Sequence, residues 1–193
     1  MREHAYGRSP EEAISDVMKW MYQRGIVQVR GGNASIVDRE NGIVYMSPTG
    51  LPRPLLKAEH IAVLDLQGAV IKGRPTSEWR MHLYLYRHQP HALAAVHAHP
   101  KALLTLTYRG QSLDPSLLSE AGIQVTCIGH VPYIRPGTEE LALAVAREAA
   151  RGCNVIVLER HGALVWSPHT IYHALDLLEA IEDLAWITLH LHL

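Results

Sequence analysis

The sequence has no phenylalanine, no excess of basic residues and no long apolar run. Its 18 Lys and Arg are balanced by 19 Asp and Glu, so it carries no charge signature of a nucleic-acid or anionic-membrane partner. No stretch of about 18 apolar residues occurs, so no membrane span is expected. The first residues lack an apolar segment after their charges, so no signal peptide is expected either.

Cysteine is also scarce, and the two residues present are Cys127 and Cys153. They form no C-x-x-C pair, no zinc-ribbon spacing and no disulfide framework. We interpret them as free thiols, which suit a reducing compartment, and we expect a cytoplasmic protein.

Several nucleotide and hydrolase motifs are missing as well. There is no G-x-G-x-x-G after a predicted strand and no G-x-x-x-x-G-K-[ST], so dinucleotide and P-loop nucleotide chemistry are unsupported. No G-x-S-x-G motif is present to mark a nucleophile elbow.

The 193 residues are expected to form one domain, residues 1–193, because no repeat, low-complexity tract or linker interrupts them. Helices are predicted from a capping box at Ser9, from Thr76, from Pro100, from Thr138 and after Ser167, the last running nearly to Leu193. Strands are predicted at 36–37, 43–46, 61–66, 69–72, 94–97, 124–128, 155–158 and 163–166. This mixed order predicts an α/β fold, with a sheet of parallel and antiparallel pairs covered by helices.

What the sequence does have is histidine, 13 residues in all. In Val96-His97-Ala98-His99-Pro100 the two histidines are two residues apart. On a strand they would project from one face about 6.6 Å apart, so that both imidazoles can converge on one cation. His161 follows another predicted strand at a Gly turn. Three neutral imidazoles with an open fourth position describe a catalytic zinc site, although each histidine alone is equally a surface or core residue.

Glu78 and three polar turns lie close to predicted element boundaries. Glu78 is either a first-turn carboxylate that the helix dipole favours or, beside a metal, a general base. In the second case, partial burial would raise its pKa. The turns could hold an anion because glycine and a helix N-terminus let backbone N–H groups approach a phosphate, although each alone is equally a turn or a cap. They are Gly31-Gly32-Asn33, Ser47-Pro48-Thr49-Gly50 and Thr76-Ser77.

Taken in order, these motifs resemble those of the class II aldolase/adducin family. The matching segments are Gly32-Asn33-Ala34-Ser35, Ser47-Pro48-Thr49-Gly50, Thr76-Ser77-Glu78, His97-Ala98-His99-Pro100, Pro132-Tyr133, Gly137-Thr138-Glu139-Glu140-Leu141 and Arg160-His161-Gly162. The match runs from about Glu11 to the last predicted helix. The pattern is most similar to that of the L-fuculose-1-phosphate aldolases within the family.

The resemblance implies a three-layer αβα sandwich with a central mixed, largely antiparallel sheet. It implies a divalent metal, usually Zn²⁺ with Mn²⁺, Co²⁺ or Fe²⁺ as other occupants, on His97, His99 and His161. It implies that Glu78 is the catalytic acid/base, and that the substrate phosphate binds to Asn33, Thr49, Gly50, Thr76 and Ser77. It also implies a homotetramer with active sites at subunit interfaces.

The implied activity is the reversible cleavage of a ketose 1-phosphate, such as L-fuculose 1-phosphate, to dihydroxyacetone phosphate and an aldehyde through a metal-stabilised enediolate. The fuculose-phosphate aldolases carry a Tyr that a neighbouring subunit supplies to the site. This sequence departs from them, because Leu118 stands in the matching segment. Eight further histidines match no ligand position and are interpreted as surface or core residues; they are at positions 82, 88, 91, 130, 169, 173, 190 and 192.

Three alternatives stay open at this point. A methylthioribulose-1-phosphate dehydratase or a pentulose-phosphate epimerase would use the same three-histidine site. Glu78 favours the aldolase over the epimerase, where an Asp is expected near this position. A non-catalytic adducin-like module is the third alternative, but such modules have lost the ligands that this sequence keeps.

Overall fold

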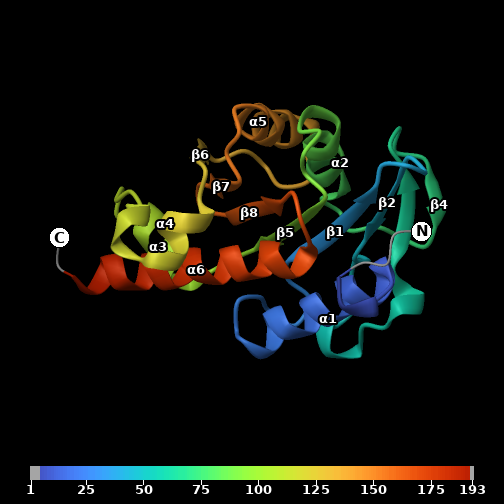
Figure 1. Ribbon diagram of the computed structural model, residues 1–193, viewed down its shortest axis with the longest axis horizontal. Helices are drawn as coiled ribbons and strands as arrows, with labels where there is room; N and C mark the ends of the chain where they lie inside the picture. The colour runs from blue at the N-terminus through green and yellow to red at the C-terminus, as the bar shows by residue number, and fades with distance from the viewer. Residues whose placement is uncertain (1–4, 192–193) are drawn as a thin grey trace.

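An eight-stranded sheet organises residues 5–191, the part of the chain that the computed structural model describes. Its strand order is β4-β3-β2-β1-β5-β8-β7-β6 (Figure 1). The bounds are β1 Asn33–Asp38, β2 Ile43–Met46, β3 Ala62–Asp65, β4 Val70–Lys72, β5 Ala94–Ala98, β6 Ile128–Val131, β7 Val155–Leu158 and β8 Gly162–Ser167. Neighbouring strands are antiparallel except for β6 and β7, which are parallel. The expectation of a mixed, largely antiparallel sheet is therefore confirmed.

Helices cover both faces of the sheet. The α-helices are α1 Pro10–Gln23, α2 Trp79–His88, α3 Lys101–Tyr108, α4 Ser119–Gln124, α5 Glu139–Ala150 and α6 Ile171–His190. Short 3₁₀ turns are η1 Ala5–Gly7, η2 Arg53–Leu55, η3 Ala58–His60 and η4 Pro115–Leu117. Figure 1 shows α2 and α5 on one side of the sheet and α1, α3, α4 and α6 on the other. Within residues 5–191 no helix is long and apolar enough to cross a membrane.

Alternation along the strands divides the apolar side chains between two cores. In β7, Val155 and Val157 belong to the core that includes residues of α1 and α6, while Ile156 and Leu158 belong to the core that includes residues of α2 and α5. Successive side chains of a strand point to opposite faces, so a strand that is apolar throughout needs cover on both. This arrangement is the three-layer sandwich that the family resemblance implied.

The boundaries of several elements follow from capping. Ser9 and Glu12 form the predicted capping box, in which the Ser9 hydroxyl accepts from the Glu12 N–H at 3.2 Å and the Glu12 carboxylate accepts from the Ser9 N–H at 3.0 Å. The last helix begins after Thr170, whose hydroxyl accepts from the His173 N–H at 3.1 Å. The predicted start at Ser167 is wrong because Ser167 is held in the sheet, paired with Ala94. His192 and Leu193 lie outside the described residues.

The strand predicted at 124–128 is also wrong. Gln124 ends α4, and the strand occupies Ile128–Val131, where it pairs with β7. Gly129 belongs there because a Cβ would lie 2.7 Å from the Glu148 Cβ of α5. Close packing of α5 on β6 therefore selects a segment whose own strand propensity is weak, and tertiary context overrides the β-branched residues before it.

Strand β1 begins earlier than predicted. The turn ends at Gly32, and Asn33, which was predicted to lie in the turn, pairs directly with His97 of β5. Ser35 pairs with Ala95 in the same ladder. Because Asn33 and Ser35 are two residues apart on a strand, they lie on one face, next to the histidine pair.

Cys127 and Cys153 are joined by a disulfide, so the prediction of two free thiols is wrong. The bond links Cys127, directly before β6, to Cys153, two residues before β7, and these two strands pair side by side. The residues are 26 apart in sequence, which hides their proximity. A cytoplasmic location loses the support that free thiols gave it and stays a prediction.

Reduction of this disulfide is expected to destabilise the protein by about 2–4 kcal/mol, because a cross-link removes conformational entropy from the unfolded chain. The measurement is urea unfolding with and without a thiol reductant. The double variant Cys127→Ala/Cys153→Ala serves as the control and should not respond to the reductant. If the native protein, purified without reductant, had two reactive thiols per chain, that result would contradict the disulfide.

Candidate metal centre and active site

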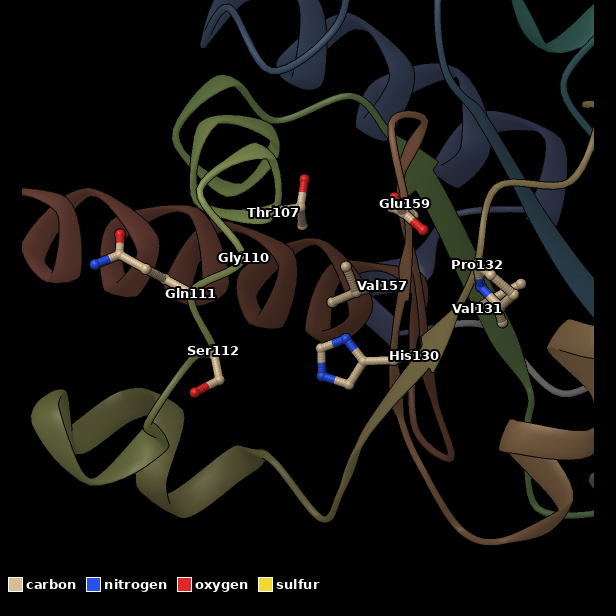
Figure 2. A pocket seen from close by; sticks show the side chains of 9 residues that line it. All are labelled: Thr107, Gly110, Gln111, Ser112, His130, Val131, Pro132, Val157 and Glu159. Atoms are coloured by element: carbon tan, nitrogen blue, oxygen red, sulfur yellow. The ribbon is translucent and has the colours of Figure 1, made fainter.

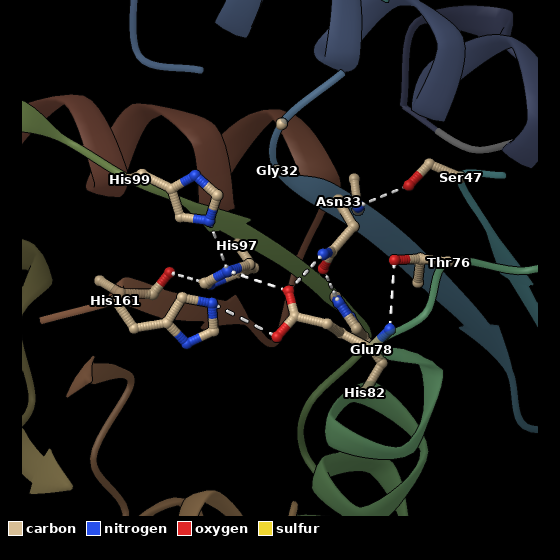
Figure 3. Close-up of polar contacts among 12 residues, drawn as sticks. Gly32, Asn33, Ser47, Thr76, Glu78, His82, His97, His99 and His161 are labelled. Carbon is tan, nitrogen blue, oxygen red and sulfur yellow. Dashed lines mark hydrogen bonds and ion pairs between the residues drawn. The ribbon is translucent and has the colours of Figure 1, made fainter. Parts of the chain in front are cut away.

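Three histidines from distant parts of the sequence converge at one end of the central strands (Figure 3). His97 lies in β5, His99 follows the end of that strand, and His161 lies in the turn between β7 and β8. One nitrogen of each ring lies within 4.8 Å of the others. Among residues 5–191 this is the one group of His, Cys, Asp or Glu side chains close enough to hold a metal ion. The convergence predicted from the strand spacing is present.

The hydrogen bonds of two of these rings fix which nitrogen faces the centre. His97 Nδ1 lies 2.9 Å from the carbonyl oxygen of Ala163, and His99 Nδ1 lies 3.2 Å from Gln28 Oε1. Both oxygens can only accept, so each Nδ1 carries a proton and each Nε2 is the nitrogen left to face the centre. The two Nε2 atoms lie 3.2 Å apart. Metal-binding histidines commonly donate their other N–H in this way, so the donor set fits a divalent cation such as zinc.

The protonation of the cluster also suits a metal. Burial, together with the neighbouring His97, lowers the pKa of His99 to about 4 and that of His161 to about 4. Both rings are therefore neutral at pH 7, the form in which imidazole binds metals.

Glu78 faces the histidines from the start of α2. It occupies the N-cap position, but its side chain makes no capping hydrogen bond and is 8% exposed. Its Oε2 lies 3.2 Å from His97 Nε2, and its Oε1 lies 3.4 Å from His161 Nε2. Burial acts to raise the pKa of Glu78, as expected, but His97, His161 and a hydrogen bond from Asn33 outweigh it and hold the pKa well below its usual range. The carboxylate is ionised and can accept a proton.

The three polar turns predicted to hold an anion are tied together through Ser47. The Ser47 hydroxyl accepts from the Ala34 N–H at 3.1 Å, and its carbonyl accepts from the Thr76 N–H at 3.0 Å. Of the five residues that the family resemblance assigned to phosphate, Asn33 and Thr76 are buried, Thr49 is half-buried, and Gly50 and Ser77 are exposed. The buried members make polar contacts: Asn33 Nδ2 donates to Glu78 Oε2, and Thr76 Oγ1 accepts from the Glu78 N–H.

Arg53 is a residue of this region that the sequence did not single out. Arg53 is 2% exposed, and its guanidinium donates to five carbonyl oxygens, those of Arg30, Gly31, Gly32, Pro48 and Leu51. Burial lowers the pKa of Arg53 to about 10, so it stays cationic at neutral pH. It joins the loops 30–32 and 48–51. The Pro-rich sequence around Arg53 does not indicate this role.

A cavity of about 420 Å³ is lined by residues other than the three clustered histidines (Figure 2). It is lined by Thr107, Gly110, Gln111, Ser112, His130, Val131, Pro132, Val157 and Glu159. Glu159 is two residues before His161, but none of the three clustered histidines lines this cavity. The candidate metal centre is therefore not part of it.

Gly162 sets the position of His161. Its φ of +142° is rarely adopted by other residues, and a Cβ there would overlap the carbonyl oxygen of Ala98 and lie 3.1 Å from the His99 Cα. Gly162→Ala is expected to push β8 away from β5 and to weaken zinc binding at least about tenfold, since ligand geometry sets metal affinity.

Gly152→Ala is the matched control, because Gly152 also has a positive φ, +93°, but a Cβ there meets no atom within 4 Å. Its cost is backbone strain of about 1–2 kcal/mol, with no change at the metal centre. A chelator competition titration measures both affinities. Equal zinc affinity in the two variants would contradict the role of Gly162 in positioning His161 for metal binding.

The chain is similar to proteins of known family over nearly its whole length. Residues 12–189 match the family described as Class II Aldolase and Adducin N-terminal domain. An L-fuculose phosphate aldolase of Methanococcus vannielii is 37% identical over 86% of this chain and 87% of its own. A 5-deoxy-D-ribulose 1-phosphate aldolase of Bacillus thuringiensis is 37% identical over 91% of this chain and 82% of its own.

A solved structure shows the same fold. The crystal structure of L-fuculose-1-phosphate aldolase from Thermus thermophilus superimposes with a TM-score of 0.84 and 26% identity, covering 96% of this chain and 95% of the other. The family match spans the three histidines and Glu78. The chain therefore belongs to the class II aldolase and adducin family, as the motif order indicated.

Proposed function

We propose that this protein is a metal-dependent aldolase that reversibly cleaves a ketose 1-phosphate to dihydroxyacetone phosphate and an aldehyde. The observation that carries the proposal is the ionised Glu78 carboxylate, whose two oxygens lie 3.2 and 3.4 Å from nitrogens of two of the converging histidines. A base held against a metal centre is the arrangement that abstraction of a proton next to a carbonyl requires. The relatives named as aldolases support this reaction class.

We propose His97, His99 and His161 as the ligands of the metal. Zn²⁺ suits three imidazoles, and Mn²⁺, Co²⁺ or Fe²⁺ can bind the same donors. When bound, the cation supplies a Lewis acid for the negative charge that develops on the substrate oxygens.

The chain's own residues then move the proton and hold the substrate. In the condensation direction, Glu78 accepts a proton from the hydroxymethyl carbon of dihydroxyacetone phosphate, and in cleavage it returns that proton to the same carbon. Asn33 donates to the carboxylate at 3.1 Å and limits its rotation. Positioning of this kind accounts for a large share of enzymatic rate enhancement.

The phosphate is proposed to bind the polar turns around Ser47. Asn33, Thr49, Gly50, Thr76 and Ser77 are the proposed contacts. The Ser77 side chain and the Gly50 backbone are exposed, so a ligand can reach them. The buried Arg53 cation behind the loops 30–32 and 48–51 adds positive potential. A phosphate held there places the reacting carbon relative to Glu78.

We also propose a homotetramer whose active sites are completed by neighbouring subunits. Large apolar side chains are exposed on α3, α4 and α6, including Tyr108 at 69%, Ile123 at 86% and Trp186 at 57%. Exposed groups of this kind are common at subunit interfaces. Sedimentation equilibrium tests the assembly, and a monomer at micromolar concentration would contradict it.

The experiment that tests the function measures release of dihydroxyacetone phosphate from L-fuculose 1-phosphate and from 5-deoxy-D-ribulose 1-phosphate. The two substrates share the phosphorylated half and differ in the aldehyde, so their kcat/KM ratio reports the aldehyde preference. The proposal expects release from at least one, lost on metal chelation and restored by Zn²⁺. No release from either with metal bound would contradict it, and methylthioribulose 1-phosphate would then be tested for dehydration.

A further inference from the structure

One face of α2 aligns three polar side chains against β1. Glu78, His82 and Tyr86 are spaced by four residues, which places them on the same side of a helix. They face Asn33 and Ser35, which share a face of the strand (Figure 3 shows the contacts among Glu78, Asn33 and His82). His82 is 0% exposed and Tyr86 is 1% exposed. His82 is therefore the core histidine that one reading of the sequence allowed, but its neighbours are polar.

The donors and acceptors of these hydrogen bonds have only one consistent assignment. The Asn33 Nδ2 donates to Glu78 Oε2 at 3.1 Å, so the NH₂ end of the amide faces the carboxylate. The other end of the amide, Oδ1, then faces His82 Nε2 and must accept. His82 Nε2 therefore carries a proton.

The same direction continues beyond His82. Burial, with the neighbouring His97, lowers the pKa of His82 to about 3, so the ring is neutral and Nδ1 is an acceptor. The Ser35 hydroxyl, 2.7 Å away, donates to it. The Tyr86 hydroxyl lies 2.7 Å from the Ser35 Oγ and 3.0 Å from the Ser35 carbonyl, so it donates to Ser35. Each polar atom in the chain of contacts has a partner of the right kind.

We propose that His82 is a positioning residue, which holds the Asn33 amide with its NH₂ on Glu78 and so orients the carboxylate toward His97 and His161. The inference rests on the proposed function, because it assumes that Glu78 is the base. An Asn33 amide turned by 180° would set its NH₂ against the His82 N–H and its oxygen against the carboxylate. Both contacts are repulsive, so the His82 proton specifies one orientation.

Two substitutions at position 82 separate this role from simple packing. In His82→Gln, the amide nitrogen reaches the place of Nε2 and can still donate to Asn33. In His82→Asn, the shorter side chain reaches the place of Nδ1 and meets Ser35 instead. We expect His82→Asn to lower kcat at least about tenfold with zinc stoichiometry intact, and His82→Gln to retain most of the rate. If His82 served only to fill space, each substitution would lower kcat in proportion to the stability that it costs.

A double-mutant cycle tests whether His82 acts through Asn33. In an Asn33→Ala background there is no amide to orient, so His82→Asn should change kcat less than about twofold. An equal fold loss in both backgrounds would overturn the proposal.

A third readout does not depend on activity. Long-range ¹H–¹⁵N spectra of the zinc-loaded protein report the tautomer of each histidine, and comparison with His82→Gln identifies the signals of His82. The inference expects the Nε2–H tautomer at pH 7. The Nδ1–H tautomer would overturn it. A protein with the Nε2–H tautomer but no aldolase activity would show that the proposed function has failed while the contacts stand.

Discussion

Glu78→Gln is expected to lower the rate of proton abstraction from dihydroxyacetone phosphate by about 10²–10⁴-fold, the usual contribution of a positioned general base. Glutamine has nearly the same size, but its amide cannot take up a proton at neutral pH. The fold and the histidine cluster should survive, because Glu78 makes no capping hydrogen bond to α2. The measurement pairs the rate of proton exchange with zinc content for the wild type and the variant.

Glu140→Gln is the matched control for this substitution. Glu140 lies in the first turn of α5 and is exposed, so the change should leave both rate and zinc content as in the wild type. Normal turnover by Glu78→Gln with zinc bound would show that another group is the base. A variant that had lost its zinc would instead place Glu78 among the groups that hold the metal.

His97→Ala is expected to lower zinc affinity by more than about 100-fold and to remove activity with it. Changes in the groups behind metal ligands already cost about 10–100-fold, and loss of a ligand exceeds that. His97 is 0% exposed, and its loss also leaves the Ala163 carbonyl without its partner, at a cost of about 1–3 kcal/mol. Zinc content by elemental analysis, with a chelator titration, measures the effect.

His91→Ala serves as the control because His91 is exposed and lies before β5, away from the cluster. It should bind one zinc per chain like the wild type. Full zinc occupancy in His97→Ala would contradict the ligand assignment. Circular dichroism before the titration separates loss of metal from loss of fold.

Much of the fold follows from local sequence signals. The Ser9 capping box and the strands predicted at 61–66 and 69–72 rest on local signals of this kind, and both are present in the structure. The strand predicted at 124–128 begins too early because β-branched residues favour it locally, whereas pairing with β7 and contact with α5 decide the position.

The candidate site was predictable only in part. Two of its histidines are two residues apart, one in β5 and one directly after its end, so the extended backbone places them together. His82 and Asn33 are 49 residues apart, and Ser35 and Tyr86 are 51 residues apart, so no local pattern reveals their contact. The carbonyl partners of Arg53 in the loop 30–32 are 21 to 23 residues away and the partner of Cys127 is 26 residues away, so they are hidden for the same reason.

The central claim is that Glu78, beside a three-histidine metal centre, abstracts a proton from a phosphorylated hydroxyketone. Solvent deuterium exchange tests it without the need for the right aldehyde. The zinc-loaded protein is mixed with dihydroxyacetone phosphate in D₂O, and the hydroxymethyl protons are followed by NMR. We predict stereospecific exchange of one of these protons, lost on chelation and in Glu78→Gln. No exchange while zinc is demonstrably bound would contradict the claim.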